Sequence, residues 1–261
     1  NNFEDVLIAF KNFEPDIVVH FAAESHVDNS VLGPKIFLET NIIGTFNLLQ
    51  ASLEIKKILP SLVFHHVSTD EVYGDLNFHD AKFTELSNYK PSSPYSASKA
   101  SSDLLVQSWA RTFKLNYVIT NCSNNFGPRQ HTEKLIPNVI RKILSNKKIP
   151  IYGNGLNIRD WIYAKDHSQA IISLHEHGVM NEKINIGGEH EISNLSLVRH
   201  ILKMMGRNED LIEFVSDRPG HDLRYAIDNS KIYTLTDWKP SQHFDQNIQE
   251  TIEWYENNPD W

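Results

Sequence analysis

Cysteine, basic charge and long apolar runs are all scarce in this sequence. Cys122 is the single cysteine among 261 residues, which excludes an internal disulfide and a cysteine-rich metal site. One cysteine is also typical of a reducing compartment, so we expect a cytoplasmic protein. No apolar run is long enough to cross a bilayer, and no basic segment precedes an apolar one at the start. The sequence therefore predicts no membrane partner.

The charge balance is acidic, with 25 Lys and Arg against 33 Asp and Glu and a net charge of −8. Such a balance argues against nucleic acid as the main partner, because the phosphate backbone attracts basic surfaces. A content of 40% hydrophobic and 22% charged residues is typical of a globular protein. The length allows one large or two modest domains.

The segment 63–69 is an apolar, β-branched run that ends in hydroxyl and carboxylate side chains. Thr69, Asp70 and Glu71 follow the apolar part directly. This pattern predicts a buried strand, and in open α/β sheets ligands bind outside the carboxyl ends of such strands. Two adjacent carboxylates at a cleft can differ in protonation. The alternative is a strand that ends in an acidic, solvated turn.

Tyr95 and Lys99 stand four residues apart, which places them on one face of a helix. We expect this helix to reach about Phe113. Its expected core face consists of Leu104, Leu105, Trp109 and Phe113.

Helix and strand patterns alternate along the first half of the chain. We expect helices near 3–10, 34–56 and 95–113, and strands at 17–21, 63–69 and 116–122. The 17–21 strand is expected to be buried. This alternation predicts an α/β fold with a doubly wound parallel sheet over residues 1–126. Residues 127–261 are expected to form mainly a smaller α+β lobe, with some segments returning to the sheet domain; 150–153 is expected to be a loop.

Eight ordered segments resemble the extended short-chain dehydrogenase/reductase family, and within it the nucleotide-sugar 4,6-dehydratases. They are 21–28, 68–74, 95–99, 124–128, 134–137, 159–161, 185–188 and 218–222. The resemblance covers essentially the whole chain in order. A Tyr-x-x-x-Lys motif alone would be weak evidence.

The resemblance implies a Rossmann-like fold, NAD as cofactor and a nucleotide-diphosphate sugar as substrate, with dTDP-glucose favoured. The implied reaction oxidises the sugar at C4, removes water across C5–C6 and returns the hydride to C6. One feature departs from the family pattern, because this chain holds no Gly-rich pyrophosphate turn. We therefore expect residues 1–126 to be an N-terminally incomplete NAD-binding domain, and this chain as given to bind NAD weakly.

The resemblance also implies the catalytic roles. Tyr95 takes the C4 hydroxyl proton, and the Lys99 ammonium favours its phenolate, while Thr69 hydrogen-bonds the C4 oxygen. Glu71 removes the C5 proton, and Asp70 protonates the departing C6 hydroxyl. Paired carboxylates with different protonation suit this chemistry.

Further residues are implied as ligand contacts. The expected cofactor contacts are Ala22, Ala23, Glu24, Ser25, Thr40, Tyr95, Lys99 and Asn125. The expected substrate contacts are Ser25, Thr69, Asn124, Lys134, Leu135, Tyr152, Arg159, Asn194, Arg218 and His221. The two arginines suit a diphosphate because guanidinium binds oxyanions bidentately. Ser193 or Asn194 is expected to cap the helix that follows, and this is the alternative role for Asn194.

Two other functions remain open. A nucleotide-sugar 4-epimerase shares Tyr95 and Lys99 but needs no acid–base pair for elimination, and a non-catalytic binding module needs neither. The pattern His175-Glu176-His177 lacks the spacing of a zinc site, so no metal is expected. By resemblance, a homodimer is expected through the helices at 34–54 and 95–113.

Overall fold

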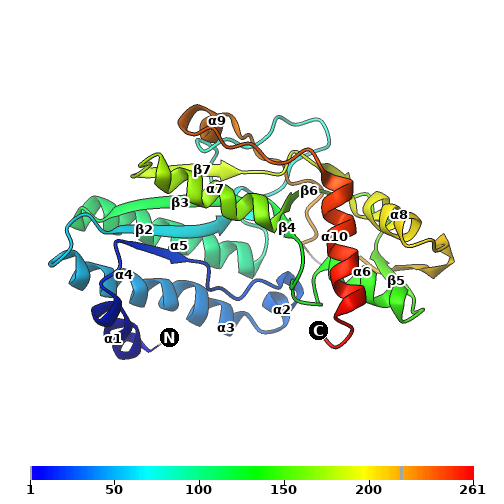
Figure 1. Ribbon diagram of the computed structural model, residues 1–261, viewed down its shortest axis with the longest axis horizontal. Coiled ribbons are helices and arrows are strands. Elements are labelled where there is room, and N and C mark those ends of the chain that lie inside the picture. The colour runs from blue at the N-terminus through cyan, green and yellow to red at the C-terminus, as the bar shows by residue number, and fades with distance from the viewer. Residues whose placement is uncertain (1, 218–219) are drawn as a thin grey trace.

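The computed structural model describes residues 2–217 and 220–261, and its centre is a four-stranded parallel sheet (Figure 1). The strand order is β1-β2-β3-β7. Their bounds are Ile17–His20, Val63–Thr69, Asn116–Cys122 and Glu182–Ile186. Every neighbouring pair is parallel. Among the described residues, no helix has the length and apolar content to cross a membrane.

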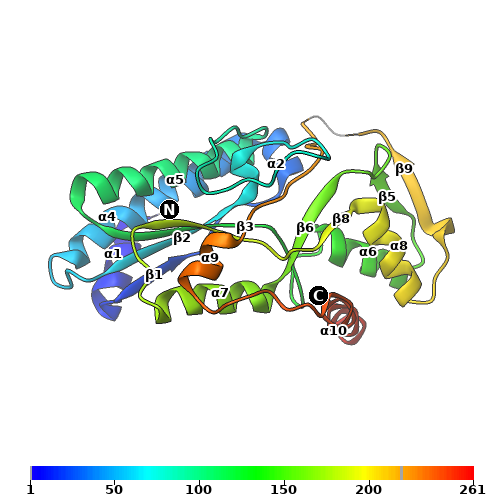
Figure 2. The ribbon, with the colours of Figure 1, turned by 90° about the horizontal axis from the view of Figure 1, so that it is seen from above.

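Helices cover both faces of this sheet (Figure 2). On one face lie α4 (Gly44–Lys56) and α5 (Pro94–Phe113), with α1 (Phe3–Phe13) packed on α4. On the other lie α7 (Ala164–Glu176) and α9 (Ser230–Leu235). Strand side chains alternate, so Phe64 packs with the α4–α5 face while Val63 and Val67 pack with the α7–α9 face. The predicted doubly wound α/β sheet is confirmed.

The helical segment 34–56 contains an irregular turn. It runs as α3 (Pro34–Phe37), then a wider π-helical stretch, η1 (Leu38–Ile43), and then α4. Such π-turns are frequent at functional sites. Here the turn carries Asn41, which is buried. Short α2 (Val27–Leu32) precedes this segment.

Two expectations about burial are wrong. β1 is an edge strand, so Ile17 and Val19 are exposed rather than buried. On α5, Leu104 is 57% exposed and Phe113 46% exposed. The buried face of α5 consists instead of Tyr95, Ser96, Ser98, Lys99, Ala100, Ser102, Asp103 and Val106. Small side chains let the helix approach the sheet closely, so the bulkiest residues do not mark its core face.

A second lobe is built beside the carboxyl end of the sheet (Figures 1 and 2). β4 (Asn124–Phe126) pairs parallel with β6 (Ile158–Tyr163), which pairs antiparallel with β8 (Glu191–Ser193). Packed around a common apolar core are α6 (Leu135–Leu144), α8 (Asn194–Met204) and α10 (Phe244–Asn257).

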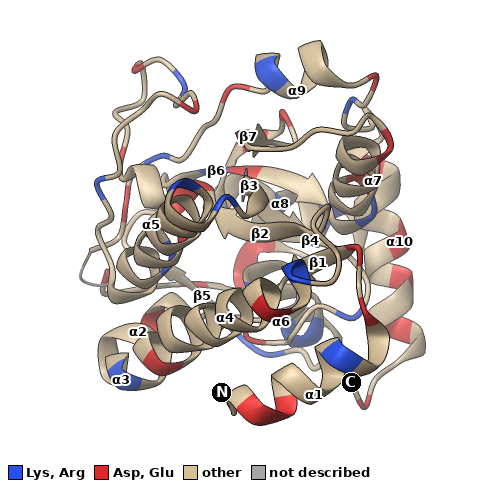
Figure 3. Cartoon of the chain, turned by 90° about the vertical axis from the view of Figure 1, so that its left-hand side faces the viewer, with Lys and Arg blue, Asp and Glu red and all other residues tan. Residues whose placement is uncertain are grey.

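Figure 3 shows the molecule from the left-hand side of Figure 1. Lys and Arg are scattered among Asp and Glu on this side.

Two local expectations in this lobe need correction. Residues 150–153 were expected as a loop, but β5 (Ile149–Tyr152) pairs with β9 (Ile212–Val215), which follows a short turn η3 (Glu209–Leu211). Ile149 and Ile151 are buried in the core, which fixes the strand despite Pro150. Helix α8 is capped by Ser193, whose hydroxyl accepts from the Ser196 N–H at 3.2 Å. Asn194 is therefore not the cap.

Candidate functional site

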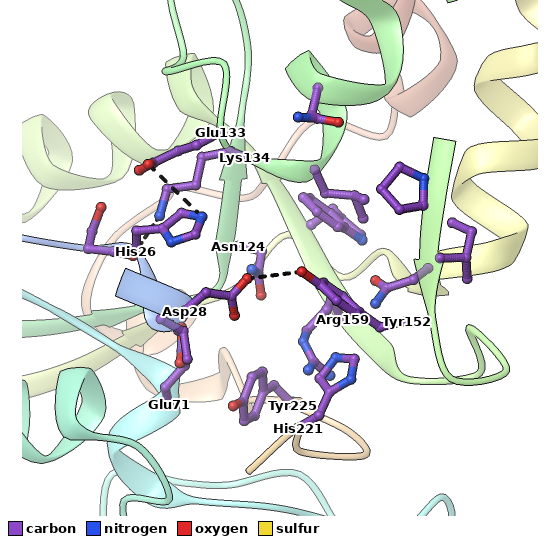
Figure 4. A pocket seen from close by; sticks show the side chains of 18 residues that line it. His26, Asp28, Glu71, Asn124, Glu133, Lys134, Tyr152, Arg159, His221 and Tyr225 are labelled. Carbon is purple, nitrogen blue, oxygen red and sulfur yellow. Dashed lines mark hydrogen bonds and ion pairs between the residues drawn. The ribbon is translucent and has the colours of Figure 1, made fainter. Parts of the chain in front are cut away.

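Two pockets meet at the carboxyl ends of β2 and β3, between the sheet and the second lobe. Their volumes are about 430 Å³ and about 410 Å³. They share Ser25, Glu71, Asn124 and Lys134 as lining residues. The first opens towards α6 and β5 and is drawn in Figure 4; the second lies over β2 and α5. The arrangement has room for two ligands that touch at Glu71 and Asn124.

The end of β2 presents the acidic pair. Thr69 begins a single turn of 3₁₀ helix, η2 (Asp70–Tyr73), and its hydroxyl accepts from the Glu71 N–H at 3.3 Å. Asp70 is 2% exposed, whereas Glu71 is partly exposed. Burial, followed by the charges of Glu71 and Asp160, raises the pKa of Asp70 well above its usual value. Asp70 is therefore suited to carry a proton, and Glu71 is the more solvated of the two.

The raised pKa of Asp70 predicts how stability depends on pH. A carboxyl with a raised folded-state pKa contributes full stability below its unfolded pKa of about 3.9, and that stability is lost as the pH rises through the folded pKa. Each unit of the rise costs about 1.4 kcal/mol once the group is ionised. Asp70→Asn removes this cost, so we expect the variant to be the more stable form at high pH.

Urea unfolding between pH 4 and pH 9 checks this expectation. The stability gained by Asp70→Asn should grow with pH over this range. If Asp70→Asn raised the free energy of unfolding by the same amount at all pH values, Asp70 would ionise as easily in the folded protein as in the unfolded one.

Helix α5 begins beside this strand end. Ser93 caps it in a reciprocal capping box with Ser96, which brings Tyr95 and Lys99 into the second pocket. The Lys99 Nζ donates to the Val67 carbonyl at 2.9 Å. Burial, followed by the charge of Glu71, raises the pKa of Tyr95 well above its usual value, although a hydrogen bond with Thr69 acts in the opposite direction.

This corrects one expectation about Tyr95. Lys99 was expected to lower the pKa of the phenol, yet the pKa is raised. The main reason is burial of the phenol, followed by the charge of Glu71. The Lys99 ammonium donates instead to the strand carbonyl of Val67.

The loop after β1 forms one wall. Asn41 in η1 accepts from the Glu24 N–H at 2.9 Å and donates to the Glu24 carbonyl at 3.0 Å and to Ser98 Oγ at 2.8 Å. These bonds fix the loop against α5. Ala23 and Ser25 line the second pocket. Ala22, Glu24 and Thr40 line neither pocket, so their cofactor roles stay predictions.

The second pocket gathers buried polar atoms that lack a hydrogen-bond partner. Among the residues lining it, these are Ser68 Oγ, Asp70 Oδ2, Asn124 Oδ1, Gln130 Oε1 and His167 Nε2. Buried polar groups are normally paired, so this pocket fits a ligand rich in hydrogen-bonding groups. A nicotinamide ribose meets that description.

Asn125 and His167 define the floor of this pocket. The His167 Nδ1 lies 2.9 Å from Asn125 Oδ1, while the Asn125 amide donates to the Ser123 carbonyl at 3.1 Å. Burial lowers the pKa of His167 to about 4, so the ring is neutral at pH 7. Burial raises the pKa of Cys122 to about 12, which leaves the thiol protonated and unreactive.

The first pocket holds most of the expected substrate contacts. Arg159 is buried, donates to the Asp222 carbonyl at 2.9 Å, and stacks on Tyr225 at 4.2 Å from the ring centroid. The pocket is also lined by Lys134, Leu135, Tyr152, Asn194 and His221. Arg218 lies outside the described residues. Figure 4 shows Glu71 and Arg159 facing the same space.

Several lining residues were not foreseen from the sequence. Tyr225, Trp161 and Asn138 line the first pocket, and His167 lines the second. Trp161 lies within a segment that carries the resemblance, so that signal was available. Nothing in the sequence pattern marked Tyr225, which reaches the pocket through its stacking on Arg159.

Comparison with known proteins gives one family. The family model described as GDP-mannose 4,6 dehydratase matches residues 1–251. The chain is 47% identical to a dTDP-glucose 4,6-dehydratase of Neisseria meningitidis serogroup B, an alignment that covers 97% of this chain and 76% of the relative.

Solved structures agree with this result. DesIV, a dTDP-glucose 4,6-dehydratase from Streptomyces venezuelae with NAD and TYD bound, superimposes with a TM-score of 0.94 at 39% identity. That match covers 100% of this chain and 78% of DesIV. A UDP-glucose 4-epimerase from Thermotoga maritima gives a TM-score of 0.89 at 25% identity, over 99% and 83% of the two chains.

Proposed function

We propose that this chain, which belongs to the GDP-mannose 4,6 dehydratase family, catalyses the NAD-dependent dehydration of dTDP-glucose to dTDP-4-keto-6-deoxyglucose. The observation that carries the proposal is the acidic pair at the junction of the two pockets. Asp70 is buried with a raised pKa and Glu71 is partly exposed, and both lie in the pocket that Tyr95 lines. An elimination needs one acid and one base held together in this way.

The first step assigned to this site is oxidation at C4. NAD, if bound in the second pocket among residues such as Ala23, Lys99 and Asn125, would supply reversible hydride transfer and a positive ring that favours the Tyr95 phenolate. Tyr95 takes the C4 hydroxyl proton, and Thr69 donates a hydrogen bond to the C4 oxygen. The hydrogen bond between Thr69 and Tyr95 supports a shared position for that oxygen.

Elimination follows from the acidity of the C5 proton next to the new ketone. Glu71 removes that proton, and Asp70 protonates the C6 hydroxyl so that it leaves as water. The raised pKa of Asp70 supports its role as the acid. Glu71, which then carries the C5 proton, would return it to C5 when hydride is added at C6, so that the elimination and the reduction balance.

The nucleotide part is assigned to the first pocket. Arg159 presents a planar guanidinium suited to the diphosphate, and its stacking on Tyr225 fixes its plane. Residues 1–126 would then supply most of the cofactor site and 127–261 most of the substrate site, with β7 completing the sheet.

Two further features support proposals about the oligomeric state and the cellular location of the protein. Exposed apolar side chains on neighbouring helices, among them Leu38, Ile43 and Leu104, support a homodimer through η1, α4 and α5. The unpaired Cys122 supports a cytoplasmic location.

Incubation of the natural protein with NAD and dTDP-glucose tests the function. We expect a product with the mass of the substrate less one water and a 4-keto group, detected by mass spectrometry and ultraviolet absorbance in base. A parallel reaction with UDP-glucose measures which nucleobase of the substrate the enzyme prefers. Interconversion of glucose and galactose nucleotides without loss of water would establish the epimerase alternative instead.

A further inference from the structure

Helix α5 carries a buried stripe of three functional groups at four-residue spacing. Tyr95, Lys99 and Asp103 share the face that packs on the sheet, and all three are buried. The proposed mechanism uses Tyr95, the family resemblance implies a role for Lys99, which lines the same pocket, and neither gives Asp103 a role. Removing a carboxylate from water is energetically costly unless it is paired. The Asp103 carboxylate therefore requires a partner.

The buried Lys99 ammonium likewise requires a negatively charged partner. Its Nζ donates to the Val67 carbonyl at 2.9 Å and lies 3.5 Å from His66 Nε2. Both of these neighbours are uncharged, since burial lowers the pKa of His66 to about 4. The His66 Nε2 lies 3.3 Å from Asp103 Oδ1. His66 therefore stands between the ammonium and the carboxylate.

Asp103 is held in its ionised form by two hydrogen-bond donors, one in a loop and one on β3. The Tyr89 hydroxyl donates to Asp103 Oδ2 at 2.7 Å, and the Asn121 amide donates to the same oxygen at 3.3 Å. Burial acts to raise the pKa of Asp103, but the contacts with His66, Lys99 and Tyr89 together hold that pKa below its usual range. The carboxylate is thus charged at neutral pH.

The other titratable groups around Lys99 carry no charge at neutral pH. His20 on β1 has a pKa lowered to about 2, first by burial. Cys122 on β3 has a pKa raised to about 12, again first by burial. His66 on β2 is neutral as well. Asp103 is the charged group among those described that offsets the burial of Lys99.

We propose that Asp103, through His66, is a positioning residue that keeps Lys99 protonated and fixed against the Val67 carbonyl. Asp103 touches neither pocket, so it acts on the reaction only through Lys99. This rests on the proposed function for its kinetic consequence alone. The protonation of Lys99 is a property of the fold and can be measured without substrate.

The first test measures that protonation directly. ¹⁵N-lysine NMR of the natural protein, with the Lys99 signal assigned through Lys99→Arg, follows the ammonium as the pH is raised. In Asp103→Asn the Lys99 proton should be lost at a pH lower by on the order of one unit or more, because burial lowers the pKa of Lys99 and the charge of Asp103 opposes that lowering. Asp103→Glu, which keeps the charge, should restore the wild-type titration.

The second test follows C4 oxidation in a single turnover as the rise of NADH absorbance. In Asp103→Asn the alkaline limb of the rate profile should move down in pH together with the Lys99 titration. Asp166→Asn on α7 is the matched control, because it also replaces a buried aspartate that accepts hydrogen bonds, from Ser241, while α7 covers the opposite face of the sheet from α5 (Figure 2). It should leave the profile unchanged.

The outcomes separate the two proposals. An unchanged Lys99 titration in Asp103→Asn overturns the role of Asp103, whatever the enzyme catalyses. A shifted titration in a protein that does not oxidise dTDP-glucose supports the role of Asp103 and contradicts the proposed function. If Asp103→Asn does not fold, the wild-type protein and Tyr89→Phe are titrated instead. A neutral Lys99 amine at pH 7 in the wild type overturns the inference. A Lys99 ammonium that loses its proton at a lower pH in Tyr89→Phe supports it.

Discussion

Glu71→Gln in the natural protein is expected to oxidise C4 of dTDP-glucose and then to stall before water is lost. Oxidation needs Tyr95, whereas removal of the C5 proton needs a basic carboxylate. Glutamine keeps the size of the side chain but has no such basicity. Loss of a general base lowers the rate by ~10²–10⁴-fold, so product should form slowly while NADH absorbance rises within one turnover.

Asp70→Asn provides the internal comparison for Glu71→Gln. It removes the acid, so its effect on elimination should shrink when C6 carries a better leaving group, since protonation then matters less. Glu71→Gln should remain slow with that substrate. If Glu71→Gln makes the 4-keto-6-deoxy sugar at the wild-type rate, Glu71 has no part in the mechanism.

Tyr95→Phe is expected to abolish the first oxidation. The variant loses the hydroxyl that would take the C4 proton and the hydrogen bond with Thr69. We expect a rate lower by ~10²–10⁴-fold, with no NADH absorbance in a single turnover. Rapid-mixing absorbance at saturating substrate measures this step apart from elimination.

Tyr73→Phe is the matched control. Tyr73 is equally buried, and its hydroxyl donates to Asn185 Oδ1 at 2.8 Å, but it lines neither pocket. Its loss should lower stability by about 1 kcal/mol and leave the oxidation rate near wild type. Near-normal oxidation by Tyr95→Phe would reduce Tyr95 to a structural residue.

The strands that position the site were predictable because their signals are local. The run 63–69 is short, apolar and β-branched and ends in polar residues, which favours a buried strand, and the structure places it second in the sheet. The buried face of α5 was not predictable in the same way. Leu104 and Phe113 are the larger apolar residues and are exposed, yet Ser98 and Ser102 are fully buried, because close packing of the helix on its neighbours selects small side chains.

Residues 149–152 show that local sequence can also fail to predict a whole strand. Pro150 indicates a loop when it is read alone, but β9, more than sixty residues away in sequence, supplies the pairing that makes a strand. Pairing partners and the core they enclose are set by long-range contacts, which local patterns do not contain.

The sequence by itself determined the alternation of helices and strands in the first half of the chain. It also placed Thr69, Asp70 and Glu71 after one strand, and Tyr95 and Lys99 along one helix. These follow from spacing and side-chain chemistry, which are properties of short segments. Only the tertiary structure decided that Asp70 is buried with a raised pKa, that the Lys99 ammonium turns towards Val67, and that the two pockets join at Glu71 and Asn124. Burial and charge are sums over neighbours from distant parts of the chain, so they exist only once the chain has folded.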